Sequence, residues 1–361
     1  QNGGGPFRFM TNLALARILR RFPHCDFACA YGSAVFKQRG YDSNLSSSSR
    51  SSSRSSSRSS SGPMLDIIIG VEDAENWHEE NMTRNPNDYA WPLSWCSGSG
   101  VKRFQETGGA HMLFHAYVPI HEAGTEGNKP FTMLKYGVIS MCDLLEDLNS
   151  WRTLYCAGRL QKPVVLLNTT QEMNERLEDN RRNALLCAIL SLGPTFTEYE
   201  LFHHITALSY TGDPRFLVGA ENIHKVRNIV DTNVGAYQDI YNPILRSLPF
   251  VHQLPLSHSD NIKYERTAMS ADEVNSIIYS LPSSLNSLLH FKTEDMLAYG
   301  KRDPCGHETL HHEIQDAIKI IVRQASAVQS VKGLISAGPL RSARYLREKW
   351  GKGLRSRLSS V

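Results

Sequence analysis

The run Met64–Val71 constrains the fold of this chain more than any other segment. It reads MLDIIIGV, is mostly β-branched and apolar, and lies between Gly62-Pro63 and Glu72-Asp73. An apolar run bounded by turn-forming and charged residues predicts a strand buried inside a sheet. Asp66 interrupts it, and a carboxylate in that setting is costly unless it is paired or binds a metal. Asp66 is therefore the first candidate for a functional residue.

A second apolar stretch, Asp26–Val35, precedes this run and contains Gly32-Ser33. Between the two lies a serine run over residues 46–61, broken only by three arginines. Such a composition cannot build a core, so we expect a disordered insertion between two neighbouring strands. The Gly-Ser turn would offer backbone N–H groups and a hydroxyl to a triphosphate, and Asp66 would hold the Mg²⁺ that neutralises its charge.

With the insertion removed, this arrangement resembles the polymerase-β-type nucleotidyltransferases, in which Gly-Ser is followed by Asp-x-Asp on the next strand. The second acidic position of that motif is Ile68 in this chain. The metal must therefore find another ligand. Glu72, Asp73 and a carboxylate from a later strand are the candidates, and we take Asp73 together with Asp66 as the metal ligands.

The rest of the chain has strands first and helices after. Strands are expected over 111–119, 135–140 and 163–167, and the hydrophobic period becomes helical after Asn168. This order predicts an α+β fold, in which a catalytic domain over 7–168 precedes a helical domain over 169–306. A C-terminal extension follows over 307–361.

The composition fits a globular protein with a sizeable core. The formal net charge of +3 over 361 residues is too small to indicate bulk nucleic-acid binding. No run of about 18 apolar residues is present, which excludes a transmembrane helix within this sequence. Seven cysteines scattered through apolar segments, without a CxxC pair, indicate reduced and mostly buried thiols and argue against a zinc ribbon.

The HExxH motif at His307–His311 would indicate a different chemistry. In the zincin pattern two histidines one helical turn apart bind zinc and the glutamate acts as base. The usual third ligand lies further along the chain than Glu313, which is too close to serve. We therefore favour a polar helix start over a zinc hydrolase.

Several segments together resemble the mitochondrial phosphatidate cytidylyltransferase family, also called the mitochondrial translocator assembly and maintenance protein family. In chain order they are YGSAVFKQ, MLDIIIGVEDAENWHEEN, KYGVIS, LYCAGRLQKPV, LSYTGDPRF and QSVKGLISAG. The resemblance implies a polymerase-β-type nucleotidyltransferase domain with a mixed sheet, then a winged-helix-like domain. It also implies a Mg²⁺-dependent reaction of CTP with phosphatidate that gives CDP-diacylglycerol and pyrophosphate.

The resemblance also implies roles for single residues. Gly32 and Ser33 would cradle the CTP triphosphate, and Lys135 would neutralise the leaving pyrophosphate unless it is only an exposed edge lysine. Arg159 and Lys162 would hold either the phosphatidate head group or the triphosphate, with plain solvated charge as the alternative.

Three other places in these segments have less definite roles. Asp213 and Arg215 would form a turn with a local ion pair, and His78 is expected to be an ordinary polar loop histidine. In RNPNDYAW the family tends to have a histidine before a Tyr-Ser pair, whereas this chain has Asp88-Tyr89-Ala90. That difference leaves the role of the loop open.

The last stretch, 339–358, has the pattern of a basic amphipathic helix. Apolar residues, Trp350 among them, recur at three- and four-residue steps, and arginines and lysines take most other positions. Anionic lipid would attract such a segment by about 1 kcal/mol per basic residue. We expect it to bind a membrane surface, with a disordered tail or a partner-binding helix as alternatives.

These expectations combine into a peripheral enzyme on the matrix side of the mitochondrial inner membrane. Its substrates would be CTP and phosphatidate, its cofactor Mg²⁺, and its product a precursor of phosphatidylglycerol and cardiolipin; no nucleic-acid partner is expected. Two alternatives remain open: a non-enzymatic assembly factor for mitochondrial protein import, and a nucleotidyltransferase with another acceptor.

Overall fold

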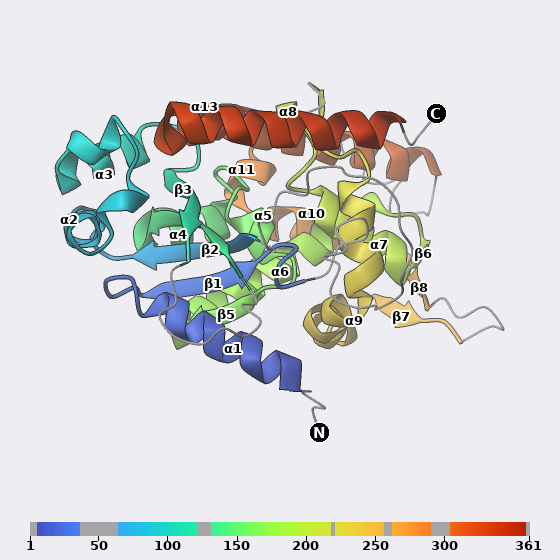
Figure 1. The fold of residues 1–361 in the computed structure, drawn as a ribbon. Coiled ribbons are helices and arrows are strands. Elements are labelled where there is room, and N and C mark those ends of the chain that lie inside the picture. Colours follow the sequence, from blue (N-terminus) through green and yellow to red (C-terminus); the bar gives the residue numbers. More distant parts are fainter. Residues whose placement is uncertain are drawn as a thin grey trace.

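A mixed five-stranded sheet lies at the centre of the molecule (Figure 1). The structure, a computed structural model, describes residues 6–36, 64–120, 131–217, 221–255, 262–289 and 304–358. The strand order is β3-β4-β2-β1-β5; β2 and β4 run parallel, and the other neighbours are antiparallel. The strands are β1 (Phe27–Tyr31), β2 (Met64–Val71), β3 (Met112–Pro119), β4 (Met133–Ser140) and β5 (Val165–Asn168).

The predicted strands of this sheet are confirmed, and β2 has the predicted bounds. It pairs with β1 on one side and β4 on the other, so that Ile67, Ile68 and Ile69 are fully buried. The serine run predicted to be an insertion lies outside the described residues.

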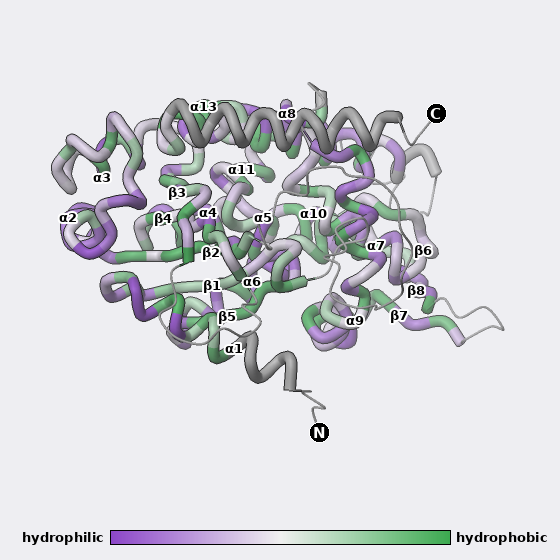
Figure 2. Tube along the Cα trace, viewed as in Figure 1, coloured by the Kyte–Doolittle hydropathy of each residue, from purple (hydrophilic) through white to green (hydrophobic). Residues whose placement is uncertain are grey.

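Helices cover both faces of the sheet. On one face α1 and α2 pack against the odd-numbered residues of β2, and on the other α4 and α6 pack against Ile68 and its neighbours. Hydrophobic residues accordingly concentrate along the central strands, whereas α2 is largely hydrophilic (Figure 2). The helices of this first part are α1 (Pro6–Leu19), α2 (Ala74–Arg84), η1 (Pro86–Asp88), η2 (Leu93–Trp95), α3 (Gly98–Glu106), α4 (Met141–Ser150) and α5 (Ala157–Leu160).

The second part of the chain is helical but also contains a small antiparallel sheet of order β6-β8-β7. The sequence predicted the helical character of 169–306, but its hydrophobic period did not indicate this sheet. Its strands, with three or four residues each, are too short for a hydrophobic period to show. Its elements are α6 (Gln171–Ser191), β6 (Thr195–Thr197), α7 (Glu198–Ala207), α8 (Pro214–Leu217), α9 (Lys225–Arg246), β7 (Val251–Gln253), β8 (Lys263–Arg266), α10 (Ala271–Ser280) and α11 (Ser283–Asn286).

One hydrophobic core joins the two parts. The buried cluster on the Ile68 face of the sheet continues through α4 and α6 into α7, α9 and α10. The two parts are therefore held together by packing, and residues from both can contribute to one site.

The chain ends in α13 (Pro304–Leu358), which is interrupted at Gly338 by a non-helical conformation with φ of 72°. Its middle is fastened to the edge strand β3: Gln329 donates to the Met112 carbonyl at 2.9 Å, and Ser336 donates to the Phe114 carbonyl at 2.8 Å. The side chains of 339–358 lie outside the described residues. No described helix is both long and apolar enough to cross a membrane.

His78 is a buried residue of α2 and not the loop histidine that the sequence predicted. Its ring nitrogens contact the Tyr89 hydroxyl at 2.8 Å and the Gln105 side-chain oxygen at 2.9 Å. Burial lowers the pKa of His78 to about 4, so the ring is neutral at pH 7. The neighbouring Asp88 pairs with Arg21 at 2.8 Å. The RNPNDYAW loop thus has a structural role on the face of the sheet opposite Ile68.

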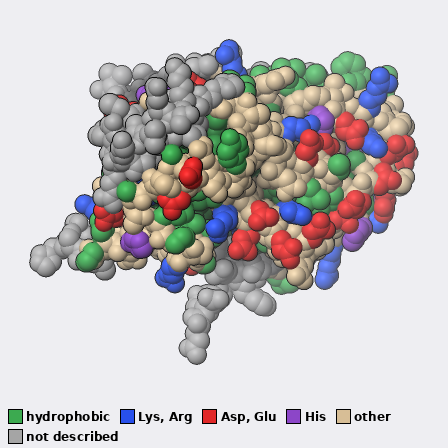
Figure 3. Space-filling model, turned by 180° about the vertical axis from the view of Figure 1, so that it is seen from behind, with side chains coloured by type: hydrophobic (Ala, Val, Ile, Leu, Met, Phe, Trp, Pro, Cys, Tyr) green, Lys and Arg blue, Asp and Glu red, His purple; other side chains and the backbone are tan. Residues whose placement is uncertain are grey.

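The surface agrees with the small net charge. Acidic and basic side chains are interspersed over the face that Figure 3 shows. Four of the cysteines with described side chains are buried free thiols (Cys25, Cys29, Cys156 and Cys187), whereas Cys142 is exposed. Burial raises the pKa of Cys29 and of Cys187 to about 12, which keeps both thiols protonated.

Candidate active site

Three polar side chains form a row across the central sheet. Tyr31 on β1 pairs with Asp66 on β2, and Asp66 pairs with Lys135 on β4. Residues that lie opposite one another on neighbouring strands project from the same face. The Lys135 Nζ lies 3.9 Å from the Asp66 Oδ1, and each of these side chains is 20% exposed. The sheet thus brings together two of the predicted site residues, and both remain accessible.

The Gly32-Ser33 turn lies directly against the carboxylate of this row. Gly32 has a φ of 82°, and a Cβ added to it would lie 2.8 Å from the Asp66 Oδ2. Glycine is required here both for the left-handed backbone and for the close approach. The Gly32 carbonyl accepts from the N–H groups of Val35 and Phe36 at 3.2 and 2.9 Å, which closes the turn with Ser33 exposed on it.

The Asp66 carboxylate is available to a ligand. Among the described residues, none donates a hydrogen bond to it, and Lys135 is its ion-pair partner. The described part of the chain also holds no group of three His, Cys, Asp or Glu side chains arranged for a metal. A lone accessible carboxylate beside the Gly32-Ser33 turn nevertheless suits Mg²⁺, which commonly takes one or two carboxylates together with substrate phosphates and waters.

Asp73 does not lie with Asp66, contrary to the prediction. It is the N-cap of α2, where its Oδ1 accepts from the backbone N–H groups of Glu75 and Asn76 at 3.0 and 3.1 Å. At about 3.3 Å per residue, the length of β2 separates Asp73 from Asp66 by roughly 20 Å. Glu72 is at the same far end, so neither replaces the acidic position taken by Ile68.

Arg159 and Lys162 lie next to the row and close to one another. The Arg159 guanidinium lies 5.0 Å from the Tyr31 ring centroid and 4.9 Å from that of Tyr155. Lys162 is 8% exposed, and its Nζ donates to the Gly158 carbonyl and, at 2.6 Å, to the Ser209 hydroxyl. Burial, with Arg159 and Lys225 nearby, lowers the pKa of Lys162 well below its ordinary value.

The charges around this pair are unbalanced. Arg215 forms an ion pair with Asp213, as the sequence predicted, and Lys225 pairs with Glu221 at 2.8 Å. In contrast, Arg159 and Lys162 have no carboxylate partner among the described residues. Two neighbouring basic groups without a counter-ion are costly to hold in their charged forms, which agrees with the lowered pKa of Lys162, and an anion that enters the site would relieve that cost.

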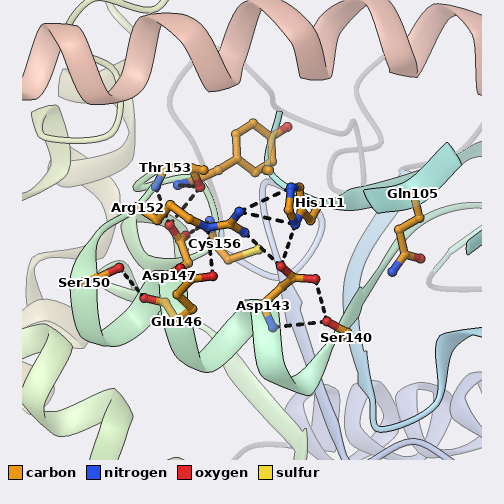
Figure 4. A network of polar contacts seen from close by, with 12 residues as sticks. Gln105, His111, Ser140, Asp143, Glu146, Asp147, Ser150, Arg152, Thr153 and Cys156 are labelled. Carbon is orange, nitrogen blue, oxygen red and sulfur yellow. Dashed lines mark hydrogen bonds and ion pairs between the residues drawn. The ribbon is translucent and has the colours of Figure 1, made fainter. Parts of the chain in front are cut away.

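Asp147 positions the segment that carries Arg159 (Figure 4). This buried carboxylate accepts from the backbone N–H groups of Thr153 and Leu154 through Oδ1, and from those of Cys156 and Ala157 through Oδ2, at 2.8–3.0 Å. The backbone it holds is unusual, since Leu154 has a φ of 53°. Asp147 therefore fixes the entry into α5, from which Arg159 projects.

The described part of the HExxH segment contains no cluster of side chains that could hold a metal. The His311 Nδ1 lies 3.1 Å from the Ser191 carbonyl oxygen, and the His307 side chain lies outside the described residues. A surface hollow of about 660 Å³ lies nearby on α7 and α9. It contains none of the predicted site residues; its lining is Thr197, Tyr199, Glu200, His203, His204, Arg227 and Asp231.

Comparison with known proteins decides the family. A family model described as phosphatidate cytidylyltransferase, mitochondrial, matches residues 15–352. The chain belongs to the mitochondrial phosphatidate cytidylyltransferase family. A protein of that name from Schizosaccharomyces pombe is 33% identical over 348 residues, covering 92% of this chain and 81% of that protein. The mouse protein of that name is 33% identical over 352 residues and covers 95% of each chain.

The family that the sequence motifs predicted is therefore confirmed over nearly the whole chain. Within this member of the phosphatidate cytidylyltransferase family, sequence reasoning missed Tyr31 and Tyr155, whose rings lie beside Arg159. It also missed Tyr210, whose ring centroid lies 4.8 Å from the Lys162 Nζ, and Lys225. Two signals were available: Tyr31 directly precedes the Gly-Ser turn, and Tyr155 lies four residues before Arg159 in one of the motif segments. Tyr210 and Lys225 come close to Lys162 only through the packing of the second part of the chain against the first.

Proposed function

We propose that this chain transfers the cytidylyl group of CTP to phosphatidate, giving CDP-diacylglycerol and pyrophosphate, as a peripheral protein on the matrix side of the mitochondrial inner membrane. The observation that carries the proposal is the convergence of Gly32, Asp66 and Lys135 beside the unbalanced cations Arg159 and Lys162. A phosphate-transfer site needs this combination of a close backbone turn, a metal-binding carboxylate and excess positive charge.

The row on the sheet would bind the nucleotide. The Gly32-Ser33 turn would cradle the triphosphate, and Lys135 would neutralise charge on the pyrophosphate as it leaves. Asp66 would hold Mg²⁺ together with the phosphates, and the ion would supply further charge neutralisation when bound.

The reaction needs little more than alignment. A phosphate oxygen of phosphatidate attacks the α-phosphorus of CTP, the new P–O bond forms in line with the bond that breaks, and the electron pair leaves with pyrophosphate. The attacking phosphate monoester is already anionic at neutral pH, so the site needs no strong general base. Arg159 and Lys162 would hold phosphate oxygens in place and reduce the repulsion between two anionic substrates.

Access to a lipid substrate requires contact with a bilayer. The basic stretch 339–358 supports that contact by its sequence alone, since its side chains lie outside the described residues. We also propose that 7–168 is the nucleotidyltransferase domain and that the second part is winged-helix-like; its three-stranded sheet among helices supports the latter.

Purified protein incubated with CTP labelled at the α-phosphorus, Mg²⁺ and phosphatidate liposomes tests the proposal. We expect label in the organic-solvent extract, at a rate that depends on phosphatidate. Transfer to RNA or protein in place of lipid would contradict the acceptor. A total absence of transfer would favour the assembly-factor alternative.

A further inference from the structure

Tyr31 has a buried hydroxyl that has no hydrogen-bond partner among the described residues. The residue is 8% exposed, and its hydroxyl is among the buried polar atoms that no described residue satisfies. A buried hydroxyl usually finds a partner, because leaving it unpaired costs free energy. Its position is a special one, in the same row as Asp66 and one residue before the Gly32 turn.

Arg159, whose guanidinium lies over the Tyr31 ring, also has a buried donor that no described residue satisfies. Its Nε is buried and has no hydrogen-bond partner in the part of the chain that the structure describes, and its guanidinium lies 5.0 Å from the ring centroid of Tyr31. Lys162 adds a second cation whose partners are a carbonyl and a hydroxyl oxygen. Two buried donors without a described partner and two basic groups without a carboxylate partner thus lie together next to Tyr31.

We infer that the Tyr31 hydroxyl and the Arg159 Nε–H are phosphate-binding donors, which hydrogen-bond one phosphoryl group of a substrate in this site. The inference rests on the proposed function and extends it to a residue that the motifs did not single out. A phosphoryl group has several acceptor oxygens and negative charge, so it satisfies both donors and balances both cations. Burial raises the pKa of Tyr31 well above its ordinary value, and the hydroxyl therefore stays protonated as a donor.

Tyr31→Phe is the decisive variant because it removes only the hydroxyl. The free protein loses no hydrogen bond, so its melting temperature should stay unchanged or rise. Its affinity for pyrophosphate, measured by calorimetry, should fall about tenfold, since a hydrogen bond to a charged group is lost. Arg159→Lys, which keeps the charge but loses the Nε–H, should weaken pyrophosphate binding in the same way.

Tyr136→Phe is the matched control. Tyr136 is also buried in the same sheet but lies on the opposite face, and its hydroxyl donates to Asp88 at 2.9 Å. This variant should lower the melting temperature and leave pyrophosphate affinity unchanged. Because pyrophosphate binding needs no lipid and no turnover, the test remains valid even if phosphatidate is not the acceptor.

Steady-state kinetics then identify which phosphate the donors hold. A raised KM for CTP in Tyr31→Phe would place the triphosphate there, and a raised KM for phosphatidate would place the acceptor phosphate there; either supports the inference. Unchanged pyrophosphate affinity together with unchanged KM values for both CTP and phosphatidate in Tyr31→Phe would overturn it. A loss of thermal stability as large as that of Tyr136→Phe would also overturn it, because the hydroxyl would then be structurally bonded.

Discussion

Replacing Gly32 by alanine should damage catalysis far more than stability. A non-glycine residue at a φ of 82° costs about 1–2 kcal/mol of folding free energy. The added Cβ would also lie 2.8 Å from the Asp66 Oδ2, so the carboxylate or the turn must move by about half an ångström to restore ordinary contact. A displacement of that size in a phosphate-transfer site is expected to lower kcat/KM by about 10- to 100-fold.

Gly108→Ala is the matched control for this prediction. Gly108 also has a positive φ, of 61°, but the nearest atom to an added Cβ is the Val328 Cγ1 at 3.5 Å. The two variants should lose similar stability in urea unfolding, whereas only Gly32→Ala should lose cytidylyl transfer from CTP to phosphatidate. Equal kcat/KM values in the two variants would refute the idea that the Gly32 backbone and the Asp66 carboxylate form one site.

Three further outcomes follow from the structure. Asp147→Asn should lower the free energy of unfolding by roughly 3 kcal/mol or more, measured by urea unfolding, because one amide oxygen cannot replace two carboxylate oxygens that accept four backbone N–H groups. His78 has a pKa of about 4 in the folded protein and near 6.5 in the unfolded chain, so the unfolded chain binds more protons between these pH values. The free energy of unfolding should therefore fall by up to about 3 kcal/mol as the pH drops from 6.5 to 4. In His78→Gln this dependence of the free energy of unfolding on pH should be weaker. Chelation of divalent ions should abolish cytidylyl transfer by the wild-type protein and leave the melting temperature of the free protein unchanged, because substrate phosphates complete the ligands of the metal. A large loss of thermal stability on chelation would contradict such a site.

The central sheet was predictable because its strands carry long apolar runs. β2 has eight residues and two turn-forming residues before it, so both its existence and its bounds could be predicted. The strands β6, β7 and β8 have three or four residues each and carry no period that separates them from loop. The sequence order of strands and helices therefore predicted the α+β class but not the second sheet.

The sequence predicted site residues correctly only where they lie on paired strands or within one motif. Gly32 and Asp66 converge because β1 and β2 pair in register across the serine-rich gap. The prediction that Asp73 shares a metal with Asp66 relied on their closeness in sequence. The eight-residue strand β2 separates the two carboxylates in space. The approach of Lys225 to Lys162 depends on how α9 packs against α6 and α7, which no local pattern encodes.

The most direct test of the central claim compares Asp66→Ala with Asp73→Ala. Each variant removes one carboxylate, and the two positions are fewer than ten residues apart in the sequence. Only Asp66 lies beside the Gly32 turn and Lys135. Asp66→Ala should lower the rate of CDP-diacylglycerol formation from CTP, Mg²⁺ and phosphatidate liposomes by at least about 100-fold while the protein stays folded. Asp73→Ala should keep that rate and lose only about 1 kcal/mol of stability through its helix cap. Full turnover by folded Asp66→Ala, or a comparable loss in Asp73→Ala, would contradict the site described for this chain.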